Sequence, residues 1–97
     1  MNPPAVVMYT TSWCPYCERA RDLLAHKSIS FQEIDIDEDP AQRAVMLQRS
    51  GGRRTVPQIF IGERHVGGFD DLAALERAGE LDKLLGKDPL TTTPPRW

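Results

Sequence analysis

The chain lacks any long apolar segment and any strong excess of charge of one sign. No apolar run approaches the ~20 residues of a membrane-spanning helix, and the start, Met1-Asn2-Pro3-Pro4, has neither the basic region nor the apolar stretch of a signal peptide. The formal net charge is only -2, so no basic face indicates binding to nucleic acid. We therefore expect a cytoplasmic protein that binds neither membranes nor nucleic acid.

Cysteine is scarce, and the sequence contains no internal repeats. The only two cysteines are Cys14 and Cys17. A disulfide between residues so close together would close a very small loop and add little stability. In a cytosolic protein such a pair is more often catalytic or metal-binding than structural. The remaining composition, 40% apolar and 27% charged over 97 residues, fits one globular domain with a modest core.

Four strands are predicted where apolar and β-branched residues run together. They are expected at residues 5–9, 29–36, 58–61 and 64–66, the last two joined by a hairpin loop at Gly62-Glu63. The first is apolar throughout, which is typical of a central strand that is buried on both faces. The second alternates imperfectly, so its register stays open.

Helices are predicted between these strands. One begins after Cys14, with Pro15 in its first turn and with Arg21 and Lys27 on its solvated sides. A second begins after Asp39. A third begins at Asp70 or Asp71 and a last short turn covers residues 81–85. These helices alternate with the strands for most of the chain.

The element order β-α-β-α-β-β-α predicts the fold class. A β-α-β unit with a right-handed crossover has parallel strands, and the hairpin then adds an antiparallel pair. We expect an α/β protein with a four-stranded mixed sheet and helices on both faces. Residues 1–86 would form this single domain. Residues 87–97 contain three prolines and three threonines and predict a flexible tail.

The position of the cysteine pair, where a strand passes into a helix, favours redox chemistry. A thiolate rather than a thiol attacks a disulfide, and the unpaired N–H groups of a helix N-terminus would favour the thiolate of Cys14. Cys17 lies one turn further on the same face, so we expect it to be less exposed and less acidic. Two alternatives stay open: an inert buried pair, or a zinc site completed by His26 and His65.

Three motifs in order resemble one family over residues 5 to 86. They are Trp13-Cys14-Pro15-Tyr16-Cys17, Thr55-Val56-Pro57 and Gly67-Gly68-Phe69-Asp70-Asp71. Together they resemble the dithiol glutaredoxins of the short bacterial kind. The resemblance implies a thioredoxin fold and a glutathione-dependent thiol–disulfide oxidoreductase. Its partners would be glutathione, as a co-substrate, and glutathionylated or disulfide-containing client proteins. We expect a monomer without a metal.

The resemblance also implies a glutathione site. Pro57 would be a cis-proline facing the active cysteine, and Val56 would pair its N–H and C=O groups with the cysteine unit of glutathione. An edge-strand proline without a ligand role is the alternative. Tyr16 would pack along the ligand, or else only against the sheet. The implied glutathione contacts are Tyr16, Arg54, Thr55, Val56, Pro57, Gly68, Phe69, Asp70 and Asp71.

Opposite charges would hold the two ends of glutathione. The N–H groups of Phe69 and Asp70 would receive the γ-glutamyl carboxylate at a helix N-terminus, and Asp71 would receive its ammonium group. Both aspartates could instead only cap the helix. Arg54 is aligned with the family arginine that binds the glycyl carboxylate, with Arg53 as the alternative.

The sequence departs from the family pattern at two places. Many relatives have a lysine shortly before the first active cysteine, where this chain has Thr11-Ser12-Trp13. Phe69 stands where cysteine, serine or threonine is common, which excludes an additional regulatory thiol. Two other functions stay open. One is a dimer that binds an iron–sulfur cluster through Cys14 and glutathione, and the other is a redoxin that a flavoprotein reductase serves.

Overall fold

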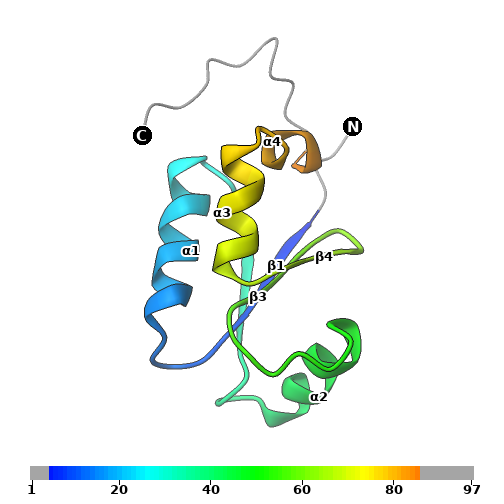
Figure 1. Ribbon diagram of the computed structural model, residues 1–97. Helices are drawn as coiled ribbons and strands as arrows, with labels where there is room; N and C mark the ends of the chain where they lie inside the picture. Colours follow the sequence, from blue (N-terminus) through cyan, green and yellow to red (C-terminus); the bar gives the residue numbers. More distant parts are fainter. Residues whose placement is uncertain (1–4, 86–97) are drawn as a thin grey trace.

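The structure, a computed structural model, describes residues 5–85, and a four-stranded sheet forms its centre (Figure 1). The strands β1 (Val6–Thr10), β2 (Gln32–Asp35), β3 (Gln58–Ile61) and β4 (Arg64–Gly67) lie in the order β2-β1-β3-β4. β1 is parallel to β2 and antiparallel to β3, and β4 is antiparallel to β3. The predicted mixed sheet is confirmed. The tail predicted for residues 87–97 lies outside the described residues.

Helices cover both faces of this sheet. α1 (Pro15–His26) and α3 (Phe69–Arg77) lie side by side on one face, and α2 (Pro40–Arg49) lies on the other (Figure 1). The short α4 (Leu81–Leu84) follows α3. Within residues 5–85, no helix is long and apolar enough to cross a membrane.

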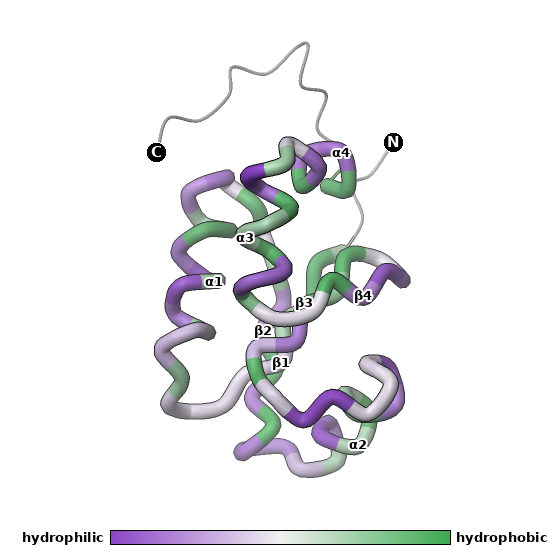
Figure 2. Tube along the Cα trace, in the orientation of Figure 1, coloured by the Kyte–Doolittle hydropathy of each residue, from purple (hydrophilic) through white to green (hydrophobic). Residues whose placement is uncertain are grey.

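Neighbouring residues of β1 contribute to two separate cores because side chains alternate along a strand. Met8 packs in a cluster with Leu24 of α1 and Leu72 of α3. Tyr9 points to the other face and packs with Met46 of α2 and Phe60. Hydrophobic and hydrophilic residues alternate along α1 and α3 in the hydropathy colouring (Figure 2). Burial of β1 on both faces explains why its sequence is apolar throughout.

The second strand is shorter than the predicted range of 29–36. The Ile29 N–H donates to the Leu24 carbonyl at 3.0 Å, so this residue closes the turn that follows α1 rather than opening a strand. Ser28, just before it, has a φ of 57°, which turns the chain out of the helix. Ile29 and Phe31 still pack against the core, which explains their apolar character without a place in the sheet.

Two predicted helix starts have different outcomes. Asp39 is the N-cap of α2, as predicted, although its side chain makes no capping hydrogen bond. The N-cap of α3 is Gly68, so the prediction of Asp70 or Asp71 as the cap was wrong by two to three residues. Asp71 instead accepts a hydrogen bond from the Gly68 N–H at 3.0 Å, from inside the first turn. A carboxylate there also interacts favourably with the helix dipole.

The prediction that Lys27 is solvated was wrong. Its Nζ lies 2.8 Å from a carboxylate oxygen of Glu76 and 2.8 Å from one of Asp82, and its side chain is only 1% exposed. Burial lowers the pKa of Lys27, but hydrogen bonds to Asp82 and Glu76 outweigh this effect and raise it above the ordinary value. The lysine thereby connects the end of α1 to α3 and α4.

Candidate active site

Cys14 is the N-cap of α1, and its backbone is extended there. Its Sγ accepts a hydrogen bond from the Cys17 N–H at 3.2 Å, as an N-cap side chain does. The Sγ also lies 3.7 Å from the Val56 carbonyl oxygen. The first N–H groups of the helix have no partners within it, so the sulfur sits where negative charge is favoured.

Cys17 differs strongly from Cys14 in its surroundings. Cys17 is fully buried, whereas Cys14 is half-buried, and both thiols are free. Burial, followed by its hydrogen bond with Cys14, raises the pKa of Cys17 to about 12, against the lowering effects of a backbone hydrogen bond with Thr11 and of the positive charge of Arg21. At neutral pH Cys17 is therefore a neutral thiol.

A cavity of about 510 Å³ opens beside the cysteine pair. This volume is in the range of pockets that hold small molecules. Its lining is Tyr16, Arg53, Thr55, Val56, Pro57, Gly68, Phe69, Asp70 and Asp71. Every residue predicted to contact glutathione lies in this lining except Arg54. Arg53, the alternative to Arg54, lies in the lining.

The Thr55-Val56-Pro57 segment forms one wall of the cavity. The Val56–Pro57 peptide bond is cis, as predicted. The pairing of β1 with β3 ends at Tyr9 and Gln58, so Val56 lies beyond the paired part of the sheet. Its backbone is thus available at the cavity wall, beside the Cys14 sulfur.

The N-terminus of α3 forms another part of the wall. Asp71 Oδ2 accepts from the Gly68 N–H and lies 3.5 Å from Arg53 Nη1. Gly67 has a φ of 114°, and a Cβ there would overlap the Asp71 carboxylate and lie 2.9 Å from Arg53 Nη1. The backbone conformation therefore favours glycine at this position, and any larger residue would also displace the Asp71 and Arg53 side chains.

The comparisons with known proteins agree with this geometry. The profile of the glutaredoxin family matches residues 6–66. This chain belongs to the glutaredoxin family. It is 63% identical over 82 residues to the glutaredoxin of Pseudomonas aeruginosa, covering 84% of this chain and 96% of that one. It is 56% identical over 80 residues to glutaredoxin 3 of Escherichia coli, covering 82% and 95%.

A solved structure extends the comparison to the fold. The buckwheat glutaredoxin–glutathione complex superposes with a TM-score of 0.77 at 34% identity, over 87% of this chain and 77% of that one. The thioredoxin-like fold is therefore established. With the redox-active pair Cys14 and Cys17, the protein is a dithiol glutaredoxin, a glutathione-dependent thiol–disulfide oxidoreductase.

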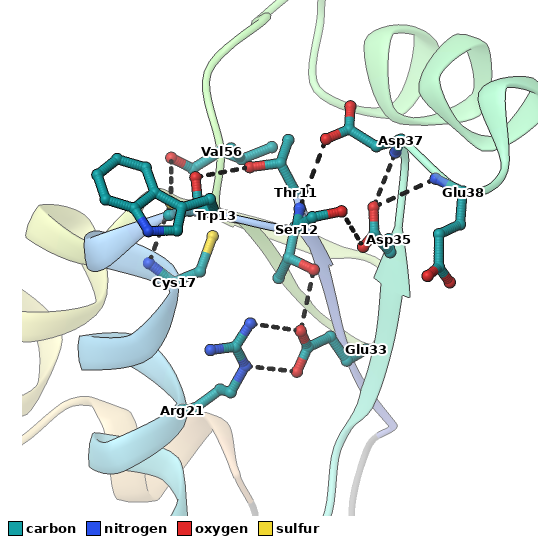
Figure 3. A network of polar contacts seen from close by, with 12 residues as sticks. Thr11, Ser12, Trp13, Cys17, Arg21, Glu33, Asp35, Asp37, Glu38 and Val56 are labelled. Atoms are coloured by element: carbon teal, nitrogen blue, oxygen red, sulfur yellow. Dashed lines mark hydrogen bonds and ion pairs between the residues drawn. The ribbon is translucent and has the colours of Figure 1, made fainter.

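A polar network that was not predicted supports the active-site loop of this glutaredoxin from β2 (Figure 3). Arg21 makes two hydrogen bonds of 2.7 Å to Glu33, which also accepts from Thr10 Oγ1 at 3.0 Å. Ser12 Oγ donates to Asp35 at 3.1 Å. The only signal for this network in the sequence is that Arg21 follows Cys17 by one helical turn, which gives no indication of its partner.

The two histidines of the zinc alternative lie in different elements of the fold. His26 is the last residue of α1 and His65 lies in β4. Over residues 5–85, no three or more histidine, cysteine, aspartate or glutamate side chains gather into a group that could hold a metal ion. Cys14 and Cys17 interact with each other and, through Cys14, with Val56.

Proposed function

We propose that this glutaredoxin reduces mixed disulfides between proteins and glutathione, with Cys14 as the nucleophile and Cys17 as the resolving thiol. One observation carries the proposal: the Cys14 sulfur accepts from the Cys17 N–H and lies 3.7 Å from the carbonyl oxygen of Val56, which lines the 510 Å³ cavity, while the Cys17 thiol itself is buried. The two cysteines thus differ in their surroundings and in access, as a two-step exchange requires.

In the first step the Cys14 thiolate attacks the glutathione sulfur of the mixed disulfide. The bond between that sulfur and the client sulfur breaks, and the client leaves as a thiolate that takes a proton from water. A new disulfide joins Cys14 to glutathione. The N–H groups at the start of α1 stabilise the thiolate before the attack and hold it at the cavity.

The second step returns Cys14 to its thiol form. A second glutathione, as the thiolate, attacks the glutathione sulfur bound to Cys14; the bond between the two breaks, Cys14 leaves as a thiolate, and oxidised glutathione is released. In a protein-disulfide cycle Cys14 first forms a mixed disulfide with one client sulfur, and Cys17 then attacks Cys14, so that the client leaves with its thiols reduced. Two glutathiones later reduce the Cys14–Cys17 disulfide and leave as oxidised glutathione. Once Cys14 is in a disulfide it no longer carries negative charge, so part of what raises the pKa of Cys17 is removed. The resolving thiol thus becomes easier to ionise when it is needed.

The charges of the cavity suit a peptide with charged ends. Phe69 and Asp70 occupy the first turn of α3, where free N–H groups favour the γ-glutamyl carboxylate. Asp71 would then bind the ammonium group beside it. Arg53 lies in the lining and Arg54 outside it, so Arg53 is the better placed for the glycyl carboxylate.

Neutral contacts would complete the site. Val56 would form one rung of an antiparallel ladder with the cysteine unit of the ligand, with Thr55, Pro57 and Gly68 as neighbouring walls. Tyr16 is 52% exposed, with the Arg19 guanidinium 5.4 Å from the centre of its ring, and the exposed ring would cover the ligand. The complex of the buckwheat relative with glutathione supports this assignment.

The same chemistry suggests where and with what the protein acts. A dithiol that glutathione reduces works in a reducing compartment, which favours the cytoplasm. Its macromolecular partners would be client proteins with accessible disulfides or glutathionylated cysteines. We propose that it acts on them as a monomer.

Single-cysteine variants test the roles. Cys14→Ser should abolish turnover of the mixed disulfide of glutathione and 2-mercaptoethanol, whereas Cys17→Ser should retain it, because a second glutathione can replace the resolving thiol. Activity in Cys14→Ser would refute the assignment. Replacing glutathione by NADPH and a flavoprotein reductase should not sustain turnover of the unmodified protein.

A further inference from the structure

The buried side chain of Gln58 connects the cavity wall to β4. Gln58 is fully buried. Its Nε2 donates to the Thr55 carbonyl at 2.9 Å and contacts Thr55 Oγ1 at 3.2 Å, and its Oε1 lies 2.6 Å from His65 Nε2. We propose that Gln58, held by His65, is a positioning residue that directs the Val56 N–H toward the cysteine unit of glutathione. This inference rests on the proposed function.

Only one orientation of the Gln58 amide fits these contacts. A backbone carbonyl can only accept, so the NH₂ group must face Thr55. The oxygen of the amide then faces His65, and His65 Nε2 must donate to it. His65 is consequently the tautomer with the proton on Nε2 whenever its ring is neutral. Burial and the nearby Arg53 and Arg49 lower its pKa, against the effect of Asp71, so the neutral form prevails at neutral pH.

The peptide bond between Thr55 and Val56 transmits this orientation. Only the next bond, Val56–Pro57, is cis in the described chain from residue 5 to 85. In a trans peptide the C=O and the following N–H point in opposite directions within one plane. Holding the Thr55 oxygen on Gln58 therefore fixes the plane and turns the Val56 N–H away from Gln58. Because Val56 lies beyond the paired part of β3, the sheet does not fix this plane.

His65 in turn is held against the sheet. Its ring stacks on Phe60, with centroids 4.8 Å apart and planes 25° from parallel, and Phe60 lies in the core that α2 covers. The hydrogen bonds from His65 to Gln58 and from Gln58 to Thr55 therefore begin at a ring that Phe60 holds in place. By contrast, Thr55 is exposed, so its carbonyl can bind water if the Gln58 donor is removed. Loss of the Gln58 amide should therefore loosen the peptide plane, with the Thr55 carbonyl left to water and His65 Nε2 left without its acceptor.

The experiment compares ligand binding in the reduced protein and in Gln58→Met, which has a side chain of similar length without hydrogen-bonding groups. The probe is S-methylglutathione, which cannot exchange disulfides, and the readouts are its Kd and the ligand-induced shift of the Val56 amide in ¹H–¹⁵N NMR spectra. We expect about fivefold weaker binding, in line with the loss of one hydrogen bond, and a reduced Val56 shift. Ile59→Val, a buried change in the same strand that packs in the core on the other face from Phe60, should bind as the parent does.

The outcomes separate this inference from the proposed function. If the parent protein gives no shifts with S-methylglutathione, the proposed glutathione site itself fails. If the parent binds and Gln58→Met binds equally well, or Ile59→Val loses as much affinity, the positioning role is refuted.

Two further measurements do not require Gln58→Met to fold. His65→Phe keeps the ring stack but removes the donor to Gln58, and should also weaken binding and reduce the Val56 shift; unchanged binding would refute the role of His65. Long-range ¹H–¹⁵N spectra of the unmodified protein should show the proton of neutral His65 on Nε2. A proton on Nδ1 would overturn the orientation of Gln58 on which the inference depends.

Discussion

Arg53 Nη1 lies 3.5 Å from Asp71 Oδ2 in the lining of the cavity, and both side chains are about half exposed. The two groups proposed to hold opposite ends of glutathione thus form an ion pair with each other. A partly exposed pair of this kind contributes little to stability, so its charges remain available for a ligand. When glutathione binds, its glycyl carboxylate can replace Asp71 as the partner of Arg53, and its ammonium group can replace Arg53 as the partner of Asp71.

We predict that Arg53→Ala raises the KM for a glutathione mixed disulfide about three- to tenfold with little change in kcat. The physical reason is that one charge-assisted hydrogen bond to the glycyl carboxylate is lost, which is worth about 1 kcal/mol at an exposed site. Arg54→Ala is the matched control, since Arg54 is adjacent in sequence but outside the lining. A larger effect of Arg54→Ala than of Arg53→Ala would reverse the assignment.

The two cysteines should differ in reactivity at neutral pH. Burial and Cys14 together raise the pKa of Cys17 to about 12, so at pH 7.5 Cys17 is protonated as well as inaccessible. We predict that iodoacetamide alkylates reduced protein once, at Cys14, as peptide mass spectrometry would show. In Cys14→Ser the remaining Cys17 should react more slowly than free cysteine. Equal labelling of both residues in folded protein would contradict this difference.

The ion pair between Arg21 and Glu33 should make the free energy of unfolding depend on pH at acid pH. Hydrogen bonds with Arg21 lower the pKa of Glu33 below its ordinary value of 4.5. A carboxyl with a lowered folded-state pKa stabilises the fold above the unfolded value, and this contribution is lost as pH falls through the folded-state pKa. We predict that Glu33→Gln lowers the free energy of unfolding by about 1 kcal/mol at pH 7 and by clearly less near pH 3.

Urea unfolding of both proteins at the two pH values measures this effect. Arg21→Met combined with Glu33→Gln serves as a double-mutant cycle, because the second change should cost little once the first has removed the pair. A difference between Glu33→Gln and the parent that stays constant from pH 7 to pH 3 would exclude the ion pair as its source.

Local signals predicted most of what positions the site. Pro15 directly after Cys14 placed the sulfur at a helix N-terminus, and the apolar run of β1 indicated a central strand. Both features depend only on neighbouring residues. The choice between Arg53 and Arg54 does not depend on neighbouring residues alone, because adjacent residues of an extended segment point to opposite sides. Which of them reaches the cavity depends on how the chain turns at Gly51 and Gly52, both with positive φ.

Contacts between distant residues could not be predicted in this way. Arg21 and Lys27 lie on a helix whose periodicity assigns both to solvated sides, yet their partners are 12 and 49 residues away in the chain. Helical periodicity gives the direction of a side chain but not which element packs there. Charged residues at such positions are therefore assigned to solvent by default, and Lys27 is the clearest exception in this protein.

Replacement of Lys27 tests the energetic consequence of that exception. The Lys27 side chain is 1% exposed, whereas those of Glu76 and Asp82 are 16% and 26% exposed. We predict that Lys27→Met lowers the free energy of unfolding by about 2 kcal/mol, less than the roughly 3–5 kcal/mol for a fully buried pair, because water can still reach the two carboxylates. Turnover of the glutathione mixed disulfide should stay unchanged at temperatures where the variant is folded, since the pair lies at the opposite end of α1 from Cys14.

A second variant shows how much of the lost stability comes from the unpaired carboxylates of Glu76 and Asp82 and how much from the lost packing of the lysine side chain. Adding Glu76→Gln and Asp82→Asn to Lys27→Met removes the two unpaired negative charges, so the triple variant should recover part of the lost stability. A triple variant less stable than Lys27→Met alone would mean that the carboxylates stabilise the protein through contacts other than the lysine.

The pKa of Lys27 is raised, so the contribution of the pair should persist below the ordinary lysine value of 10.5 and disappear only as pH rises through the folded-state pKa. Unfolding experiments from pH 7 to pH 11 should therefore show parent and Lys27→Met converging only on the alkaline side.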